Sequence, residues 1–455
     1  MAIERERVQR LNYNDVLDGS YVLYWMQASQ RAEWNHALEY AIDRANELGQ
    51  PLVALLGLTD DYPEANLRHY AFMLEGLAET QAALRQRGVQ LVVRRQSPEQ
   101  AAAEMAEAAS LVVTDRGYVR VQRQWRDHVA KAAPCSVVQV ESDVVVPIKV
   151  VSKKEEYAAA TIRPKIHKHL DRFLVPIEHR EVKQDSLGLD FGGLDCSDPD
   201  AVLDQLDVDR SVGRQTYYRG GTTRATKRLD AFIADKLDAY ADQRNDPSLG
   251  IWSSMSPCLQ FGQISPLYIA LAVRDARGAK QESIDAYLEE LIVRRELSMN
   301  FVFYNPEYDS YKCLPDWAHA TLAEHKDDER EYVYTARELE AAETHDPYWN
   351  AAMREMVLTG KMANYMRMYW GKKVMEWTNT PEYAFRVLLA LNNKYFLDGR
   401  NPNSFTGVAW CFGKHDRPWT ERPVFGKTRY MNANGLRRKF DIEAYVKQVQ
   451  QLEDS

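Results

Sequence analysis

Serine and threonine hydroxyls gather near glycines in two neighbouring segments, residues 216–240 and 253–265. The second segment, SSMSPCLQFGQIS, places small hydroxyl residues directly before Pro257. This order is typical of a helix start, where free backbone N–H groups and the helix dipole favour a phosphate. The first segment, TYYRGGTTRATKRLDAFIADKLDAY, has adjacent glycines that let the backbone approach a ligand closely. An ordinary serine N-cap accounts for the same residues without a ligand, so composition alone leaves both interpretations open.

Two tryptophans lie seven residues apart in TGKMANYMRMYWGKKVMEW, residues 359–377. On one helix, Trp370 and Trp377 would share a face and lie about 10–11 Å apart along the axis. An indole can be oxidised by one electron at a time, so closely spaced tryptophans can pass electrons through a protein. Simple core packing is the other interpretation of this spacing.

A third segment, LNNKYFLDGRNPNSFTGVAW at residues 391–410, brings together amides, a carboxylate and a guanidinium group. Asp398, Gly399 and Arg400 are predicted to end a helix and to begin a loop rich in glycine and asparagine. The amide of Asn392 can both donate and accept hydrogen bonds. That suits contact with a ligand, although a hydrogen bond at the end of a helix is the simpler interpretation.

Together these segments resemble the photolyase and cryptochrome superfamily, and most closely its class II cyclobutane pyrimidine dimer photolyases, along nearly the whole chain. The resemblance rests on an aromatic and glycine-containing turn, a helix, and a Ser-x-Ser-Pro-x-Leu-x-x-Gly-x-x-Ser run. Arg244-Asn245-Asp246-Pro247 also matches class II members, in which the arginine and the asparagine lie beside the flavin and the lesion. The resemblance implies that the diphosphate and ribityl chain of FAD are held by Tyr218, Ser254, Met255 and Ser256.

The resemblance further implies an electron-transfer chain that leads to the flavin. Its flavin-proximal, middle and outer members map to Trp370, Trp349 and Trp377, in that order. An ion pair between Asp398 and Arg367 is expected against the isoalloxazine ring, and Asn392 is expected to face flavin N5. Burying such an ion pair is unfavourable unless both ends are well hydrogen-bonded.

The resemblance implies a lesion pocket in which the flipped-out dimer stacks on the ring of Trp410. The other residues implied to line this pocket are Arg244, Asn245, Glu290 and Met368. In EELIVRREL, several relatives have a second pocket tryptophan where this chain has Arg294. One aromatic wall is therefore expected to be missing, with Arg294 contacting phosphate or base instead. Glu289 and Glu290 are adjacent, so either can contact the dimer; Glu290 is favoured.

Hydrophobic periodicity predicts how the chain positions these residues. Strands alternate with helices in the first part, which indicates βαβ units and a mostly parallel sheet; later segments have helical spacing only. The predicted fold class is α/β plus all-α, with a Rossmann-like domain at 18–147, a long linker at 148–215 and a helical FAD-binding domain at 216–455. The expected strands are 21–26, 51–58, 90–93, 110–114 and 136–140. The expected helices include 32–48, 67–88, 98–108, 119–132, one or two around 154–173, 224–241, 266–276, 283–303, 336–343, 348–377 and 381–391.

The charge of the chain is unevenly distributed. The net charge of −8 counts against a nucleic-acid partner, yet residues 417–440 contain seven basic residues and one acid. A local surplus of this kind attracts phosphates, and Arg417 and Arg429 are its candidate DNA contacts. A solvated basic face without a partner is the alternative.

Cysteine usage and hydropathy limit the cell compartment. The five cysteines are scattered without CxxC spacing, which predicts neither a disulfide framework nor a metal site. No apolar run of 18 residues or more occurs, and the N-terminus is charged rather than apolar as in a secretion signal. We therefore expect a cytoplasmic protein, associated with the nucleoid if it is prokaryotic, that does not bind a membrane.

The expected function is that of a carbon–carbon lyase: fully reduced FAD, excited by blue light, repairs cyclobutane pyrimidine dimers in UV-damaged DNA. The resemblance also implies an antenna chromophore, a deazaflavin or a folate, but no motif identifies which. A monomer without an obligate protein partner is expected. The alternative is a cryptochrome-like flavin photoreceptor without repair activity. Such proteins often carry an extended C-terminal tail, which is not expected here because the sequence stops soon after the basic segment, at Ser455. A nucleotide-binding α/β enzyme is disfavoured, because YVLYWMQASQR has no glycine-rich loop.

Overall fold

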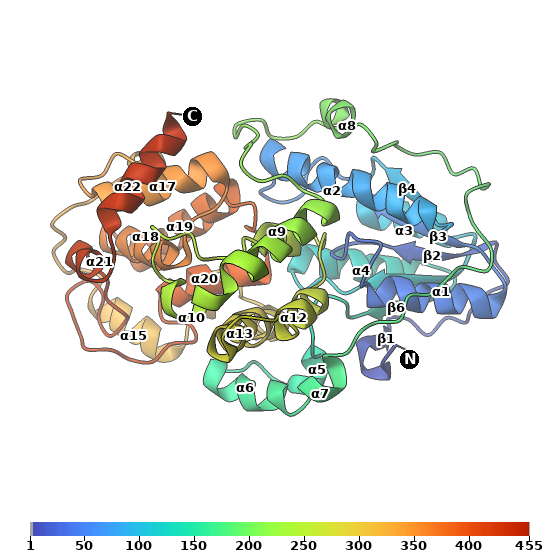
Figure 1. Ribbon diagram of the computed structural model, residues 1–455, viewed down its shortest axis with the longest axis horizontal. Coiled ribbons are helices and arrows are strands. Elements are labelled where there is room, and N and C mark those ends of the chain that lie inside the picture. Colours follow the sequence, from blue (N-terminus) through green and yellow to red (C-terminus); the bar gives the residue numbers. More distant parts are fainter. Residues whose placement is uncertain (1–2, 455) are drawn as a thin grey trace.

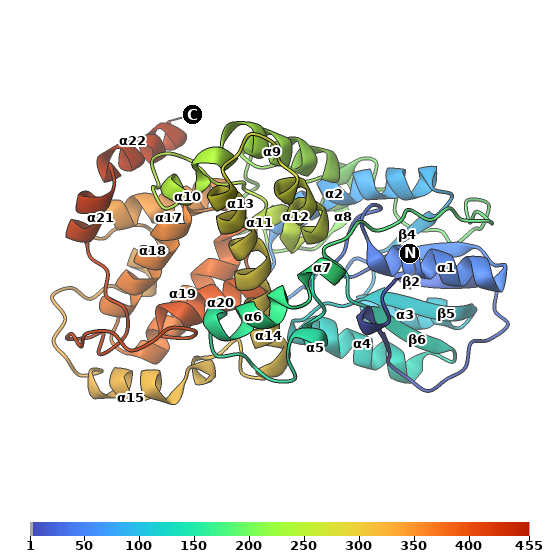
Figure 2. The same cartoon turned by 60° about the horizontal axis from the view of Figure 1, so that its bottom comes forward.

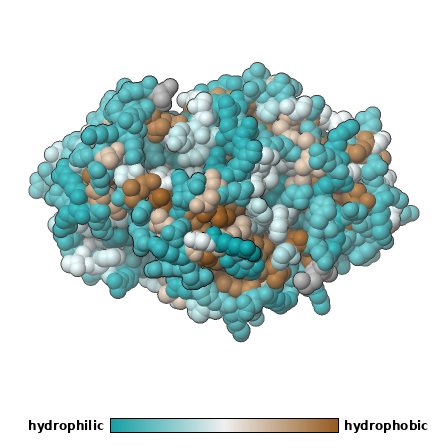
Figure 3. Space-filling view, viewed as in Figure 1, coloured by the Kyte–Doolittle hydropathy of each residue, from teal (hydrophilic) through white to brown (hydrophobic). Residues whose placement is uncertain are grey.

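The computed structural model describes residues 3–454. A sheet covered by helices forms one half of the molecule, and an all-helical part forms the other half (Figure 1). Figure 2 shows that α5, α6 and α7 lie beside the junction of the two halves. In the view of Figure 3 the surface is mostly hydrophilic, and apolar residues gather mainly near its middle, around α12 and α13. The predicted fold class is confirmed.

The sheet has six strands in the order β1-β6-β5-β2-β3-β4, and all pairs except β1 with β6 are parallel. Val- and Leu-rich runs form the central strands because helices cover both faces and exclude water. The short edge strand β1 precedes residue 18 and was not predicted. The strands are β1 (Val8–Arg10), β2 (Tyr21–Trp25), β3 (Leu52–Gly57), β4 (Gln90–Arg94), β5 (Ala109–Asp115) and β6 (Ser136–Val140). The covering helices are α1 (His36–Leu48), α2 (Leu67–Gln86), α3 (Pro98–Ala106) and α4 (Arg120–Ala132).

The connecting segment covers the edge of the sheet rather than hanging free. The Ser186 amide donates to the Gly88 carbonyl oxygen, and the Leu194 amide donates to that of Val93. This pairing protects the exposed edge beside β4 from other chains. Helix α8 then packs on α2. The helices of this segment are α5 (Ile148–Val151), α6 (Ala159–His167), α7 (Leu170–Phe173) and α8 (Pro199–Gln205).

The helical half differs from the sequence predictions at two places. The helix expected over 348–377 is divided at Gly360, which has a φ of 73°, and a Cβ there would lie 2.7 Å from Leu397 Cγ. The loop predicted after Arg400 is wrong, because Asn401 caps a helix whose first turn contains Pro402. The helices are α9 (Thr222–Asp235), α10 (Tyr240–Gln243), α11 (Ser256–Gln260), α12 (Pro266–Arg274), α13 (Gln281–Leu288), α14 (Arg295–Tyr304), α15 (Asp316–Glu324), α16 (Ala336–Glu340), α17 (Pro347–Thr359), α18 (Asn364–Glu376), α19 (Pro381–Tyr395), α20 (Pro402–Cys411), α21 (Ala433–Lys439) and α22 (Ile442–Glu453).

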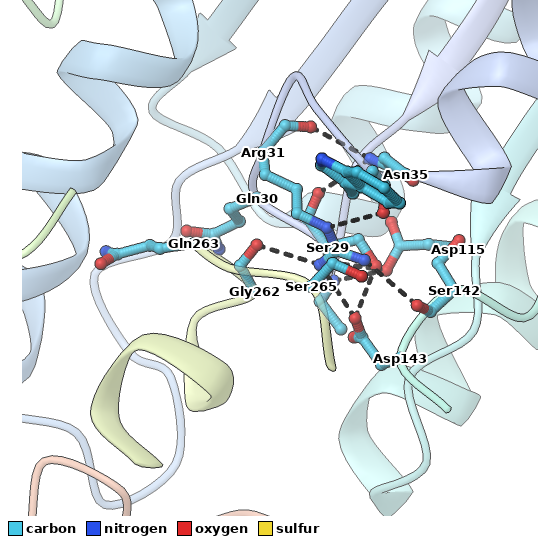
Figure 4. Close-up of polar contacts among 12 residues, drawn as sticks. Ser29, Gln30, Arg31, Asn35, Asp115, Ser142, Asp143, Gly262, Gln263 and Ser265 are labelled. Atoms are coloured by element: carbon cyan, nitrogen blue, oxygen red, sulfur yellow. Dashed lines mark hydrogen bonds and ion pairs between the residues drawn. The ribbon is translucent and has the colours of Figure 1, made fainter. Parts of the chain in front are cut away.

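A buried polar network joins the two halves (Figure 4). The Arg31 guanidinium pairs with Asp143 at 3.0 Å and donates to the carbonyl oxygen of Gly262, also at 3.0 Å. Gly262 has a φ of 64°, and a Cβ there would overlap the carbonyl oxygen of Ala28. Nearby, the Asp115 carboxylate accepts hydrogen bonds from three successive backbone amides after β2. Since buried charges persist only when they are paired and hydrogen-bonded, this network fixes the orientation of the two halves.

Candidate functional site

The predicted flavin segment at residues 253–265 places Ser254 in a strained backbone position with a φ of 56°. Its hydroxyl accepts a hydrogen bond from Lys361 Nζ at 2.6 Å and lies 3.5 Å from the hydroxyl of Tyr218. Met255 is buried, and Ser256 begins α11 and lines a cavity together with Asp398. The serine N-cap interpretation is wrong for Ser256, because Met255 occupies the cap position of α11 and no side chain caps the helix. The Ser253 and Ser254 hydroxyls instead accept hydrogen bonds from Tyr287 and Lys361.

Cations collect around Ser254. The ammonium of Lys361 lies 5.7 Å from the ring centre of Tyr218, and the guanidinium of Arg228 lies 5.1 Å from the same ring. Burial is the main cause that lowers the pKa of Lys361 to about 7; Asp398 and Glu355 oppose the shift, and Arg367 and Arg228 add to it. Lys361 was not predicted as a site residue. A cluster of this kind, beside serine hydroxyls and aromatic rings, fits the diphosphate of the FAD that the resemblance implies.

Asp398 and Arg367 form the predicted ion pair, which joins α18 to the chain after α19. The guanidinium of Arg367 lies 3.6 Å from the ring centre of Phe396, and its Nε has no partner among residues 3–454. Asn392 is buried on α19, and its amide nitrogen donates to Asn393 Oδ1 and Ser404 Oγ. The side-chain Oδ1 of Asn392 is therefore the amide atom left to accept a hydrogen bond from a ligand. The predicted contact with flavin N5 needs such an acceptor.

The three predicted tryptophans meet where α17 and α18 pack together. Trp349 Nε1 donates to the carbonyl oxygen of Trp370 at 3.0 Å, and the ring centres of Trp349 and Trp377 lie 5.7 Å apart. All three are buried. Trp377 follows the last residue of α18 instead of lying inside one long helix. The rings of Tyr334 and His345, which were not predicted, lie against Trp377 with centres at 5.5 and 5.2 Å.

Charged residues along the π-helical turn η3 (Glu289–Arg294) form two separate ion-pair groups. Arg244 pairs with Glu290 at 2.8 Å, whereas Glu289 pairs with Arg163 at 2.7 Å and contacts Arg294 at 3.4 Å. The two glutamates thus have different partners, and the lesion contact of Glu290 stays a prediction.

Arg294 and Trp410 face each other across the same region. The guanidinium of Arg294 lies 5.7 Å from the Trp410 ring centre, at the distance of a cation–π contact. Arg294 therefore covers the ring that a second tryptophan would have faced. The exposed Asn245 follows Arg244, and Met368 is half-buried on α18. No contact of either residue with Trp410 is among those described for residues 3–454.

In the basic segment, Arg417 and Arg429 flank one exposed aromatic ring. Their guanidinium groups lie 5.6 and 5.5 Å from the ring centre of Trp419, whose exposed fraction is 41%. Arg437 lies away from Trp419 on α21, and its Nε donates to the hydroxyl of Tyr348. The seven basic residues therefore do not form one uniform face. Trp419 was not predicted as a site residue, although an exposed tryptophan between two arginines suits base stacking.

A second cavity lies at the carboxyl ends of β2 and β3, where ligands bind in open α/β sheets. Its lining comes from both halves of the molecule and includes Met26, Leu58, Tyr62, His69, Trp125, Phe261 and Arg400. Burial holds the pKa of His69 well below its usual range, so this histidine is neutral. The cavity wall combines apolar and aromatic side chains with polar ones, among them Gln27, Gln122 and Arg400. No motif in the sequence indicates this cavity.

Known proteins resemble this chain in sequence and in fold. The family model for DNA photolyase matches residues 22–183. The deoxyribodipyrimidine photo-lyase of Methanothermobacter thermautotrophicus is 53% identical over 456 residues, which cover 99% of this chain and 100% of the relative. That of Arabidopsis thaliana is 37% identical over 444 residues, covering 95% and 89%. An archaeal photolyase structure from Sulfolobus tokodaii with two FAD molecules has a TM-score of 0.70 at 17% identity, covering 95% and 91%. The chain belongs to the DNA photolyase family.

Proposed function

We propose that this protein is a deoxyribodipyrimidine photo-lyase that repairs cyclobutane pyrimidine dimers in UV-damaged DNA with light. One observation carries the proposal: a photo-lyase matches the chain over 100% of its own length at 53% identity. The same observation favours repair over the function of a cryptochrome-like photoreceptor. The site supports it, because a cation cluster, the Arg367–Asp398 pair and buried tryptophans adjoin in the helical half.

FAD in its fully reduced form supplies the light-excited electron that splits the dimer and then returns. The residues that would hold it are Tyr218, Ser254, Met255 and Ser256 at the diphosphate and ribityl chain, with Arg367, Asp398 and Asn392 at the ring. The side-chain oxygen of Asn392, whose amide nitrogen donates to Asn393 and Ser404, would accept a hydrogen bond from flavin N5. The buried Arg367–Asp398 pair would keep opposite charges fixed beside the ring.

DNA binding is assigned to the basic segment and the η3 region. Arg417 and Arg429 would contact phosphates, since such contacts supply most of the affinity for DNA. Flipping the dimer out of the helix requires a few kcal/mol, least for a damaged pair. Trp410 would then stack on the dimer, while Glu290, held by Arg244, would accept hydrogen bonds from it.

The buried tryptophans serve a separate step, the light-driven reduction of oxidised flavin. Electrons would pass inward from Trp377, the outer member, through Trp349 to Trp370, the member nearest the flavin. Trp349 is placed between the other two, by a hydrogen bond to the backbone of one and by ring contact with the other. This step would return enzyme with oxidised flavin to its active, reduced form, and it is not part of dimer splitting.

The cavity at the carboxyl ends of β2 and β3 is the candidate site for an antenna chromophore. Its wall of apolar, aromatic and polar side chains suits a flat aromatic pigment that carries polar groups, and deazaflavin and folate both meet that description. We further propose a cytoplasmic monomer without an obligate partner. Five buried cysteines that form no disulfide suit a reducing compartment. Within residues 3–454, no helix has the length and apolarity needed to cross a membrane.

A repair assay tests the proposal. The purified, flavin-loaded and reduced protein is mixed with a thymine-dimer oligonucleotide under blue light, with a matched sample in the dark. Recovery of the thymine ultraviolet absorbance in the light alone is the expected result. Bound flavin without repair would instead favour the photoreceptor, and the absence of flavin after reconstitution would overturn the proposal altogether.

A further inference from the structure

Lys361 lies at the turn between α17 and α18, directly after Gly360. Its side chain is partly buried, and its ammonium group lies 5.6 Å from the ring centre of Trp252 and 5.7 Å from that of Tyr218. The hydrogen bond to Ser254 Oγ, at 2.6 Å, holds the ammonium beside the strained turn. A lysine is thus fixed between two aromatic rings and a hydroxyl, a position that favours a cation.

The surrounding charges leave Lys361 without a direct counter-ion. Asp398 is paired with Arg367, and Glu355 on α17 accepts from the hydroxyl of Tyr445. Arg228 on α9 adds a further positive charge, and its guanidinium contacts the sulfur of Cys258. Within residues 3–454, neither Lys361 nor Arg228 forms an ion pair with a carboxylate. The cluster therefore holds more positive than negative charge, which is unfavourable in a partly buried site.

A bound dianion would remove this imbalance. The diphosphate of FAD carries two negative charges, which equals the number of unpaired cations at this place. We propose that Lys361 is a ligand of the FAD diphosphate and takes up a proton when FAD binds, so that FAD binding weakens as the pH rises. This inference rests on the proposed function, and it adds a pH-dependent step in cofactor loading.

The sign of the effect follows from linkage. Burial lowers the pKa of Lys361 to about 7 without the flavin, while Asp398 and Glu355 partly oppose that shift. A neighbouring anion favours the charged lysine and raises its pKa in the complex. Affinity is then greatest below pH 7, where the lysine is already charged. Above pH 7 the FAD dissociation constant is expected to rise about tenfold per pH unit, or roughly thirtyfold by pH 8.5.

The test uses the flavin-loaded protein. It is diluted at a series of pH values between 6 and 8.5, and the fluorescence of released FAD gives the dissociation constant. Lys361→Met is expected to weaken FAD binding at pH 6 by more than tenfold and to abolish the pH dependence. Lys361→Arg keeps the charge and is expected to bind FAD with nearly constant affinity across the range. Lys372→Met is the matched control, since Lys372 is a buried lysine that contacts Thr428 instead.

The outcomes are distinct. A wild-type dissociation constant that does not change with pH would overturn the inference, and so would unchanged pH dependence in Lys361→Met. Loss of affinity in Lys372→Met equal to that in Lys361→Met would show a general effect of removing buried charge and would also overturn it. A wild-type protein that binds no FAD at any pH would contradict the proposed function itself.

Discussion

Replacing Trp370 with phenylalanine separates electron transfer from structural stability. Trp370 is 2% exposed, and its Nε1 has no hydrogen-bond partner among residues 3–454. Phenylalanine removes apolar area and leaves a small cavity, at about 1–2 kcal/mol. It also removes a buried donor without a partner, which is worth about 1–3 kcal/mol in the opposite direction. The two effects nearly cancel, so we expect the stability of Trp370→Phe to lie within about 1 kcal/mol of wild type.

Trp349→Phe differs in one interaction. Trp349 is 0% exposed, and its Nε1 donates to the Trp370 carbonyl oxygen. The same change therefore loses area and a made hydrogen bond of about 1 kcal/mol. We expect a loss of about 2–3 kcal/mol in the free energy of unfolding. Both variants should nonetheless lose light-driven reduction of oxidised FAD, because each breaks the chain of rings.

Three measurements check this reasoning. Urea unfolding gives the stabilities, the bleaching of flavin absorbance under blue light gives photoreduction, and dimer repair is measured on chemically reduced enzyme. Repair should stay near wild type in both variants. Trp317→Phe is the control, since the Trp317 indole donates to the Tyr157 hydroxyl and is not one of the three electron-transfer tryptophans. Equal stability losses in Trp349→Phe and Trp370→Phe would refute the energetic argument, and wild-type photoreduction in either would refute the electron path.

The remaining predictions concern the lesion pocket and the flavin edge. Trp410→Ala should weaken binding of dimer-containing DNA by about 1–3 kcal/mol, as expected for loss of one base-stacking ring; filter binding that shows unchanged affinity would contradict the stacking. Arg294→Gln should reduce the slope of log affinity against log salt by about 0.9, the value for one phosphate contact, and an unchanged slope would leave Arg294 to base contact. Asn392→Leu should alter the absorption spectra recorded during stepwise reduction of the flavin, and spectra identical to wild type would count against its contact with N5.

The sequence predicts the elements of this fold well where burial is continuous. The parallel strands are short, largely buried runs rich in Val and Leu, so their positions follow from hydropathy. Strand β1 has only three residues beside charged neighbours, and no such run marks it. Helix α20 was missed because Gly399, Asn401 and Asn403 resemble a loop. Asn401 followed by Pro402 is nevertheless a helix-start signal, and it could have identified the helix.

The candidate site could be predicted only in part. Arg367 and Asp398 lie 31 residues apart, and neither periodicity nor composition brings them together. The family resemblance paired them, and the structure places them in contact. Lys361 escaped notice because a lysine in a glycine turn is usually solvated, and its position between two rings depends on segments distant in sequence. The sequence did not predict that the Arg294 guanidinium lies against Trp410, and its expected contact with phosphate or base stays a prediction.

The buried network around Arg31, Asp143 and Gly262 also has an optical consequence. Resonance energy transfer between two pigments depends on their separation and on the angle between their transition dipoles. A pigment in the cavity beside β2 would take its orientation from the sheet half, and the flavin would take its orientation from the helical half. Because charged hydrogen bonds lock the halves together, that angle is set once, when the protein folds. The interface would thus set the relative orientation of the two pigments. Substitutions that loosen it would lower the efficiency of energy transfer while leaving both pigments bound.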